Sequence, residues 1–552
     1  MNTRILLLAV VFACAGGTKE TKEGPPPAAT AQTQPPAAPA AEPAPQPAPA
    51  PGVPPPATTG EKPVVTGTPP AAEVQKPSPA ATPEPPLMPD EPFRAEQPRP
   101  LAVQPHFAAP VPLQKKLKNG ARVLIVENHQ VPLVAVDIRF FHGVDADPAD
   151  RPGLAEFVAD TVDEGTKTRS AEKFAEQVEN LAAHLGAGAA LEGSSAHLNC
   201  LSETLPDALE LFADMIQNPA FRAEDVERVR VLRLTGLEQK RANLGALASD
   251  EADRILFGPE HPWGKPSGGT PESVAAITPA ELTAFHARWW VPNNAIISVS
   301  GDIKPAEIVQ LLNEKFAGWK AKPLPKLELP PFPRLAKRNI DALEKATATQ
   351  SQVWVVGQLF KASDPDALPL RVANLPLGGM FTSRLNMNLR EKHGYSYGVR
   401  SGLSLMRNSG TFAASGAIIA RNTVEAVAEY ENELKKFSDG NVSETELANA
   451  QEALIRGLPA SLETNDAVSG AMSNLVSLGL PLDYYKTLPG RIAKVSQKDV
   501  KRVVTKWIKP DRWPVVIVGP IGQSRAALEK LDLGPVTIAP APGSAPKTSA
   551  SR

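Results

Sequence analysis

The sequence predicts an α+β protein of two homologous domains, each an antiparallel sheet packed with helices. Three features predict this class: a proline-rich stretch that ends near Pro110, a duplication in the remainder, and strand patterns followed by helical ones. Of the 552 residues, 59 are Pro, and 28 of these lie between Thr21 and Pro110. Such a composition has little apolar surface to bury, so we expect a disordered tether there. The folded part therefore begins near Val111.

The charge balance and the cysteine count exclude several classes of protein. The chain carries 58 basic and 60 acidic residues, which argues against a nucleic-acid partner bound by neutralising phosphates. Two cysteines exclude a disulfide framework and an all-cysteine metal site. Cys200 lies in an alternating, strand-like stretch, and we expect it to be a lone buried thiol.

The first 14 residues predict export from the cytoplasm. The apolar run at 5–12 is shorter than the roughly 20 residues that a bilayer requires, and it is typical of a signal peptide. It ends in Val-Phe-Ala-Cys, which resembles the bacterial lipoprotein processing box, with Cys14 as the acylated residue. We expect a periplasm-facing lipoprotein of a Gram-negative cell envelope, with 15–110 as its Pro/Ala-rich tether. Because Ala13-x-Ala15 also fits ordinary signal cleavage, secretion to the periplasm is the alternative.

The duplication becomes visible when the sequence is shifted by 218 residues. Segment 277–282 then falls on 495–500, and the tryptophan, proline and glycine that follow stay in register without a gap. Thr278 and Ser496 are each placed to cap a helix. We interpret the two copies as an N-terminal domain at 111–322 and a C-terminal domain at 336–533. A proline-rich linker at 323–335 joins them, and 534–552 is expected to be a disordered tail.

Local patterns predict the elements within each half. β-branched runs at 121–126 and 134–140 predict a hairpin, and helical periodicity covers 153–164, 170–185, 205–217 and 223–256. In the second half, 411–419 is strand-like, whereas 422–437 and 443–458 are helical.

Three segments resemble the insulinase/pitrilysin family of metallopeptidases, especially its bacterial and mitochondrial-processing-peptidase branch. They are Gly-Leu-Ala-Glu-Phe-Val-Ala-Asp at 153–160, Phe-Gly-Pro-Glu-His-Pro-Trp-Gly at 257–264, and Leu-Gly-Gly-Met-Phe-Thr-Ser-Arg-Leu at 377–385 with Leu-Arg-Glu-Lys-His-Gly-Tyr-Ser-Tyr at 389–397. The resemblance covers nearly all of 111–533. It implies two α+β domains that form one clamshell half of the insulinase/pitrilysin type.

The chain departs from the family at the zinc motif. Active members carry His-x-x-Glu-His on the helix after Gly-Leu-Ala, where the histidines bind zinc and Glu activates water. Here Glu156 and Asp160 stand at the histidine positions, Ala159 at the base position and Leu234 at the third ligand position. Glu227 alone matches the family's supporting acid. The resemblance therefore implies a degenerate motif and no zinc bound by this chain.

Glu156 and Asp160 allow two interpretations. Their spacing of four puts both carboxylates on one helix face. We favour a solvated acidic face near a helix N-terminus, where the helix dipole stabilises negative charge. The alternative is an active metalloendopeptidase that uses them as atypical ligands for a hard ion.

Arg390 and Tyr397 keep the separation of the family's C-terminal Arg–Tyr pair. The resemblance implies that this pair reaches over the peptide bond being cut. A tyrosine there can hydrogen-bond the developing oxyanion, and an arginine can bind a substrate carbonyl. The alternative is that Arg390 closes a helix and Tyr397 is an ordinary strand aromatic.

Together, the resemblance implies the non-zinc subunit of a heteromeric zinc metallopeptidase. Its expected partner is a zinc-bearing paralogue in a heterodimer, which Arg390 and Tyr397 would serve in trans. Unfolded peptides are the expected substrates, and the lipid anchor would hold the chain to a membrane. The alternative function is a non-catalytic structural or peptide-binding envelope protein.

Overall fold

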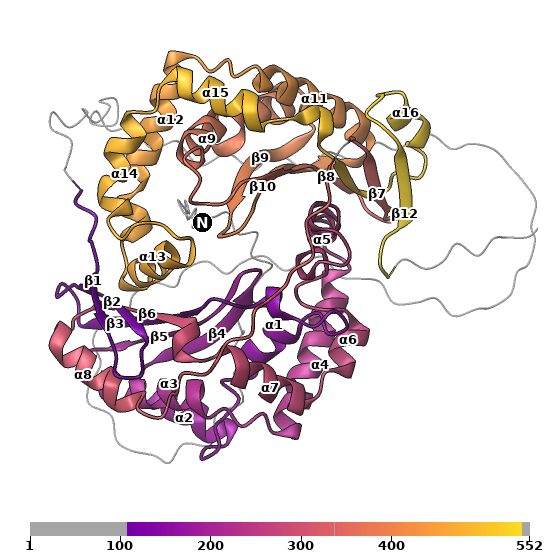
Figure 1. Cartoon of the computed structure of the whole chain (residues 1–552). Coiled ribbons are helices and arrows are strands. Elements are labelled where there is room, and N and C mark those ends of the chain that lie inside the picture. The colour runs from indigo at the N-terminus through magenta and orange to yellow at the C-terminus, as the bar shows by residue number, and fades with distance from the viewer. Residues whose placement is uncertain (1–106, 336, 544–552) are drawn as a thin grey trace, which may run out of the picture. The chain divides into compact units, whose positions relative to one another are not determined.

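A computed structural model describes residues 107–335 and 337–543 (Figure 1). The signal peptide, Cys14 and nearly all of the predicted tether lie outside these residues. The tail predicted at 534–552 is wrong in part, because Val536–Pro540 form a strand, β12, that pairs with β7. Each helix within the described ranges is too short or too polar to cross a bilayer.

The first half contains a six-stranded mixed sheet with the order β1-β2-β6-β3-β5-β4. β2 and β6 are parallel and the other pairs are antiparallel. The strands are β1 (Leu113–Lys116), β2 (Arg122–Glu127), β3 (Leu133–Phe140), β4 (His184–Ala190), β5 (Gly193–Leu201) and β6 (Ala295–Gly301). Cys200 on β5 is a buried free thiol, as predicted, and burial raises its pKa to about 12.

The second half repeats this sheet with the order β12-β7-β11-β8-β10-β9. β7 runs parallel to both β11 and β12, and the remaining pairs are antiparallel. The further strands are β7 (Ile340–Glu344), β8 (Gln350–Leu359), β9 (Ser396–Leu405), β10 (Gly410–Ile419) and β11 (Val515–Gly519). Five strands thus match in order and direction, which confirms the duplication. The edge strand next to β2 or β7 differs, since it is β1 in the first sheet and β12 in the second.

The hairpin predicted at 121–126 and 134–140 is wrong. Both segments are strands, but β6 lies between them and pairs with each. For the same reason the sheets are mixed and not purely antiparallel: the strand that follows the repeated helix inserts next to β2 and β7 in parallel. The α+β class and the two-domain arrangement are confirmed.

Helices of the first half depart from the predicted ranges at three points, the first being that the helix predicted at 153–164 ends at Ala159. They are α1 (Leu154–Ala159), α2 (Ala171–Asn180), α3 (Leu205–Gln217), α4 (Ala223–Lys240), α5 (Leu244–Phe257), α6 (Pro271–Ala276), α7 (Pro279–Trp289) and α8 (Pro305–Lys315). The segment predicted at 223–256 breaks before Asn243, whose side chain caps α5 by accepting from the backbone N–H of Ala246 at 3.1 Å. The helix predicted at 170–185 ends at Asn180 because β4 begins at His184.

Helices of the second half agree closely with the predicted ranges. They are α9 (Ala367–Asn374), α10 (Arg384–Asn386), α11 (Thr423–Ser438), α12 (Glu444–Gly457), α13 (Asn465–Ser477), α14 (Tyr484–Ala493), α15 (Gln497–Trp507) and α16 (Arg525–Glu529), with π-helical segments η5 (Leu375–Gly379) and η6 (Met387–Lys392). Thr278 and Ser496 begin α7 and α15 with capping boxes, as the duplication predicts. Figure 1 shows α3 and α7 on one face of the first sheet.

The two halves exchange one helix each, and the exchanged helices are equivalent in the duplication. α5 packs against β8 and β11 of the second sheet, and its apolar side contributes Leu247 and Leu256 to a cluster with Trp354. α13 packs against β3 and β6 of the first sheet. That contact is polar, since Ser469 donates to the Ser298 carbonyl and Ser473 to the Ser298 hydroxyl, both at 2.9 Å.

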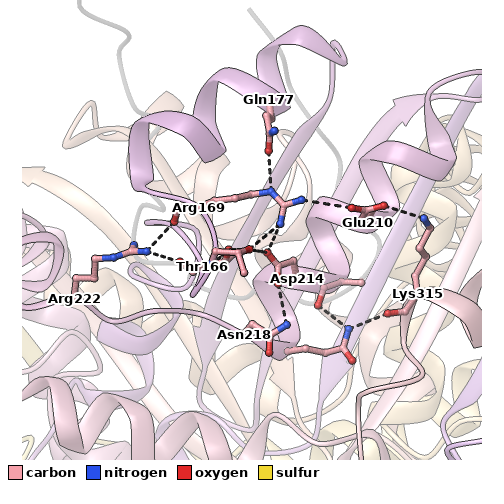
Figure 2. Close-up of polar contacts among 11 residues, drawn as sticks. Thr166, Arg169, Gln177, Glu210, Asp214, Asn218, Arg222 and Lys315 are labelled. Atoms are coloured by element: carbon pink, nitrogen blue, oxygen red, sulfur yellow. Dashed lines mark hydrogen bonds and ion pairs between the residues drawn. The ribbon is translucent and has the colours of Figure 1, made fainter.

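An ion-pair network fixes the chain between α1 and α4 (Figure 2). The Arg169 guanidinium donates to Gln177 of α2 at 2.8 Å and to Asp214 of α3 at 2.6 Å. Arg222, directly before α4, donates to the Arg169 carbonyl at 3.0 Å. Asn218 adds a 2.9 Å bond to Asp214. The start of α4 is therefore positioned relative to α2 and α3 by charged and amide groups.

Candidate functional site

The degenerate motif lies on α1, a helix fixed firmly at its N-terminus. Gly153 precedes it with φ of 90°, a left-handed conformation that favours glycine. The buried Asp147 carboxylate accepts from the backbone N–H groups of Gly153 and Ala155, both at 2.8 Å. Burial nevertheless raises the pKa of Asp147 well above its usual value. Phe157 and its apolar neighbours on α1 face the core, so the acidic side points away from it.

Arg233 of α4 lies between the two carboxylates that replace the histidines. Its guanidinium pairs with Asp160 through Nη1 and with Glu156 at 3.5 Å through Nη2. The same Nη2 donates to the Gly268 carbonyl at 2.8 Å, and the guanidinium lies 5.5 Å from the Phe157 ring centre. The Arg233 side chain is 9% exposed, against 25% for Glu156 and 48% for Asp160. The Arg233 guanidinium, held in place by these contacts, therefore offsets part of the negative charge of Glu156 and Asp160.

The residues present do not fit a catalytic zinc ion. The Arg233 guanidinium already pairs with both carboxylates, and a second cation beside it would be repelled. Leu234 packs against the core of the first half and offers no ligand atom. The buried Ala159 offers no base. Within the described ranges no cluster of three His, Cys, Asp or Glu side chains could hold a metal.

The prediction of a solvated acidic face is therefore incomplete, because Glu156 and Asp160 form ion pairs with Arg233. Glu227, predicted as the surviving supporting acid, does not join it. Its exposed carboxylate accepts from Arg230 Nε at 2.9 Å on its own helix. Arg230 in turn donates to the Val274 carbonyl and lies over Phe157 at 5.3 Å. The structure thus brings together Glu156, Asp160 and an arginine that sequence reasoning missed.

A cavity of about 220 Å³ adjoins Glu156. Its lining includes Asp250 and Asp253 of α5, Lys265, and Trp354 of the second sheet. Asp250 pairs with Lys240 at 2.7 Å, whereas Asp253 makes no hydrogen bond among the described residues. Burial, reinforced by the nearby Asp250 charge, raises the pKa of Asp253 to about 8. The spacing of three on one helix is the signal that could have indicated this acidic pair.

Arg390 and Tyr397 lie on the second half, at the surface. Tyr397 on β9 is 88% exposed. Arg390 on η6 lies over the exposed Phe381 ring at 4.5 Å and contacts Glu391 at 3.1 Å. In the part of the chain that the structure describes, no hydrogen bond joins Arg390 to Tyr397. Both side chains are therefore available to an external group.

Two buried asparagines hold the segment that carries Arg390. Asn386 donates to the Phe381 carbonyl at 2.7 Å and accepts from the Val399 N–H at 3.1 Å, which ties the loop before η6 to β9. Asn388 donates to Glu429 at 2.9 Å and to Glu433 at 2.8 Å, which ties η6 to α11. π-helical segments are frequent at functional sites. Sequence reasoning missed both asparagines, because local pattern does not indicate which amides are buried.

Comparison with known proteins agrees with this geometry. Residues 122–249 match the family model described as Insulinase (Peptidase family M16), and 276–454 match the one described as Peptidase M16 inactive domain. A Mycobacterium bovis protein, named as an uncharacterized zinc protease, is 26% identical over 77% of this chain and 97% of its own length. A Helicobacter pylori protein, named as the non-peptidase homolog YmxG, is 28% identical over 69% of this chain and 88% of its own length.

A solved structure is similar over the same region. The peptidase M16 inactive domain from Pseudomonas fluorescens aligns with a TM-score of 0.69 and 28% identity, covering 74% of this chain and 98% of that one. The names of the relatives point to both proteases and non-peptidases. The functional assignment therefore has to rest on the residues at the motif positions.

Proposed function

We propose that this protein, which belongs to the insulinase family of M16 peptidases, is the non-zinc subunit of a heteromeric zinc metallopeptidase. It binds unfolded peptides, and its partner is a zinc-bearing paralogue. Arg390 and Tyr397 act in trans on the substrate held at the partner's metal. The chain is a lipoprotein of the cell envelope, anchored through Cys14.

The position of Arg233 is the observation that carries the non-catalytic half of this proposal. The arginine supplies the positive charge that two carboxylates require, and its burial against Phe157 fixes it there. Zinc binding would have to displace an internal ion pair and would still find neither histidine nor a water-activating glutamate. The chain alone has no means of activating water at this position.

The trans role of Arg390 and Tyr397 is supported by their exposure and by the rigidity behind them. An exposed phenol on the same half as an exposed guanidinium can donate to a developing oxyanion, which is useful only if another chain supplies the nucleophile. Asn386 and Asn388 hold this segment in place through buried hydrogen bonds. A surface without a ligand would not need that support.

Peptide binding is supported by the open edge of the first sheet. β4 is an outermost strand rich in glycine and alanine, and an extended peptide can add to such an edge through backbone hydrogen bonds. The last residues of β4 also line the cavity beside Glu156.

Activity of the isolated chain tests the first half of the proposal. The purified protein is incubated with zinc and a fluorogenic unstructured peptide. We expect no chelator-sensitive cleavage and no retained stoichiometric zinc after gel filtration. Cleavage that a chelator abolishes would show that Glu156 and Asp160 form a working metal site, and the proposal would be wrong.

Reconstitution tests the trans contribution. A zinc-bearing paralogue from the same cell envelope is assayed with the wild-type chain and with Arg390→Ala or Tyr397→Phe. We expect each variant to lower kcat by roughly 100-fold, the usual scale for one oxyanion donor, without loss of complex formation. Arg525→Ala, on a surface helix of the same half, is the matched control. Unchanged kcat in both site variants would contradict the trans role.

The name of the Helicobacter relative favours a second candidate, a peptide-binding envelope protein that has no active partner. A pull-down from envelope extract separates the two candidates. Recovery of a homologue with intact His-x-x-Glu-His supports the heteromeric peptidase, and recovery of peptides or structural envelope proteins alone supports the second candidate.

A further inference from the structure

A basic groove lies along β1, one of the two outermost strands of the first sheet. Lys115, Lys116 and Arg122 line it, together with Gln114, Phe141 and Asn293. No carboxylate lines the described part of this groove. β1 is the edge opposite to β4, where the proposed function places the substrate peptide, and it lies on a different sheet from Arg390 and Tyr397. The role of the groove is therefore separate from the proposed peptidase function.

The arrangement of the cations in this groove lowers the stability of the sheet. Lys116 lies directly opposite Arg122 in the antiparallel register of β1 and β2. Like charges at such cross-strand positions destabilise a sheet. Within the residues that the structure describes, Lys115, Lys116 and Arg122 make no ion pair. Some exposed lysines elsewhere do have a partner on their own helix, as with Lys173 and Glu176 at 2.9 Å.

A fourth cation extends the positive surface beside the groove. Phe141 packs with Arg122 at 6.0 Å and with Arg407 at 5.6 Å from its ring centre. Arg407 donates to the Phe141 carbonyl at 2.8 Å and is thereby held in place. The lining of the groove therefore combines the Phe141 ring with the Arg122 guanidinium, and Arg407 lies on the same ring beside the groove.

The backbone of β1 is open on its outer side. β1 pairs with β2 alone, and its four residues are all exposed, including Leu113 at 43%. An unpaired strand edge is a template for an added strand. Basic side chains along such an edge select the charge of what is added.

We infer that the β1 edge binds an extended acidic peptide segment of a partner protein. The segment adds to β1 as a further strand, and its carboxylates relieve the repulsion between Lys116 and Arg122 while pairing with Lys115. A lipid surface is the less fitting partner, because lipid-binding clusters contain about four to eight basic residues and need no strand edge. The groove instead offers two lysines on an edge strand with free backbone groups and Arg122 opposite on β2, an arrangement suited to strand addition.

Fluorescence anisotropy with a labelled peptide of alternating Glu and Val tests the inference on the full chain. We expect binding that weakens with salt, and about a tenfold or greater loss in the Lys115→Glu/Lys116→Glu variant. Lys486→Glu/Lys494→Glu, on exposed residues of the other half, is the matched control and should bind normally. A Lys/Val peptide of equal length should not bind.

Two further measurements separate a binding defect from a folding defect. Lys116→Glu removes the repulsion with Arg122, so its urea midpoint should equal or exceed that of the wild type while binding weakens. Hydrogen exchange at 113–116 should slow when the acidic peptide is present. Equal binding by the charge-reversed variant, unchanged exchange in β1, or binding to phosphatidylglycerol vesicles without binding to the peptide would each overturn the inference.

Discussion

Arg233 places a monovalent guanidinium between the two carboxylates at the zinc-motif positions. Its chemistry differs from that of a divalent metal ion. A zinc ion polarises bound water, whereas a guanidinium has only N–H donors and no site for a hydroxide. The pairing of Arg233 with Glu156 and Asp160 joins α4 to α1. We therefore interpret Arg233 as a structural substitute that keeps the helices together without chemistry.

Replacement of Arg233 by methionine tests this interpretation. Arg233→Met leaves two nearby carboxylates without their cation, and we expect a loss of about 2 kcal/mol in the free energy of unfolding, reduced by the partial exposure of Asp160. The triple variant with Glu156→Gln and Asp160→Asn should recover roughly half, because the mutual repulsion is gone. Urea unfolding measures both differences.

The control for this prediction is Arg456→Met, whose guanidinium pairs with Glu452 on the exposed face of its own helix. It should change stability by less than about 0.5 kcal/mol. If Arg233→Met behaves like the control, the ion pair does not hold α1 to α4.

The sequence predicted the loss of the zinc ligands but not what took their place. Positions 156, 159, 160 and 234 follow from alignment of a motif, and their residue types are enough to exclude the usual chemistry. Arg233 is one residue before the expected ligand and therefore points to a different side of α4. Only the packing of α4 against α1 reveals that this side faces the carboxylates.

Among the elements, α10 and η6 depend on an anchor in α12. Arg384 of α10 pairs in a bidentate manner with Glu446, with Nε and Nη2 each 2.7 Å from a carboxylate oxygen. Glu446 also closes the capping box of α12 with Ser443. Because η6 directly follows α10, this one carboxylate stabilises a helix terminus and positions the segment that carries Arg390.

The pH dependence of stability should report this anchor. The bond from Arg384, followed by the capping interactions with Ser443, lowers the pKa of Glu446 from 4.5 to about 2. A lowered folded-state pKa stabilises the protein above the unfolded value and loses that effect as the pH falls from about 4.5 to about 2. Glu446→Gln should therefore cost about 1–2 kcal/mol at pH 7 and approach the wild type near pH 2.

Glu444→Gln is the matched control, since Glu444 is an exposed residue in the first turn of the same helix. Its stability difference from the wild type should be a few tenths of a kcal/mol at pH 7. Urea unfolding at several pH values measures the stability difference between Glu446→Gln and the wild type. If this difference does not shrink as the pH falls, the effect is not ionic.

Element types were predictable where the signal is local, and pairing was not. Helices α3, α11 and α12 carry their periodicity in their own residues, and α12 also carries its capping box, so they match the predicted ranges closely. β2 and β3 were recognised as strands, but the strand between them comes from 295–301. No pattern within 121–140 can indicate a partner so distant in sequence. β12 was missed because a short edge strand after a loop has no strong alternation.

At the scale of the whole molecule, the duplication has produced two halves that complete each other. α5 leaves the first half to cover the second sheet, and α13 does the reverse. The turn between β4 and β5 adds a polar link, in which the Glu192 carboxylate accepts from the backbone N–H groups of Arg407 at 2.5 Å and Asn408 at 3.1 Å. Each sheet therefore lacks part of its cover when the other half is absent.

This exchange predicts that the halves 107–322 and 323–543 do not fold as independent domains. Alone, the first would expose the apolar side of α5, including Leu247 and Leu256, and the second would leave Trp354 and its neighbours uncovered. We expect each to be insoluble or to lack a cooperative unfolding transition. Co-expressed as two chains, they should purify as a one-to-one complex, because the contacts do not require the linker. Cooperative unfolding of either isolated half, measured by circular dichroism, would show that the exchanged helices are dispensable for folding.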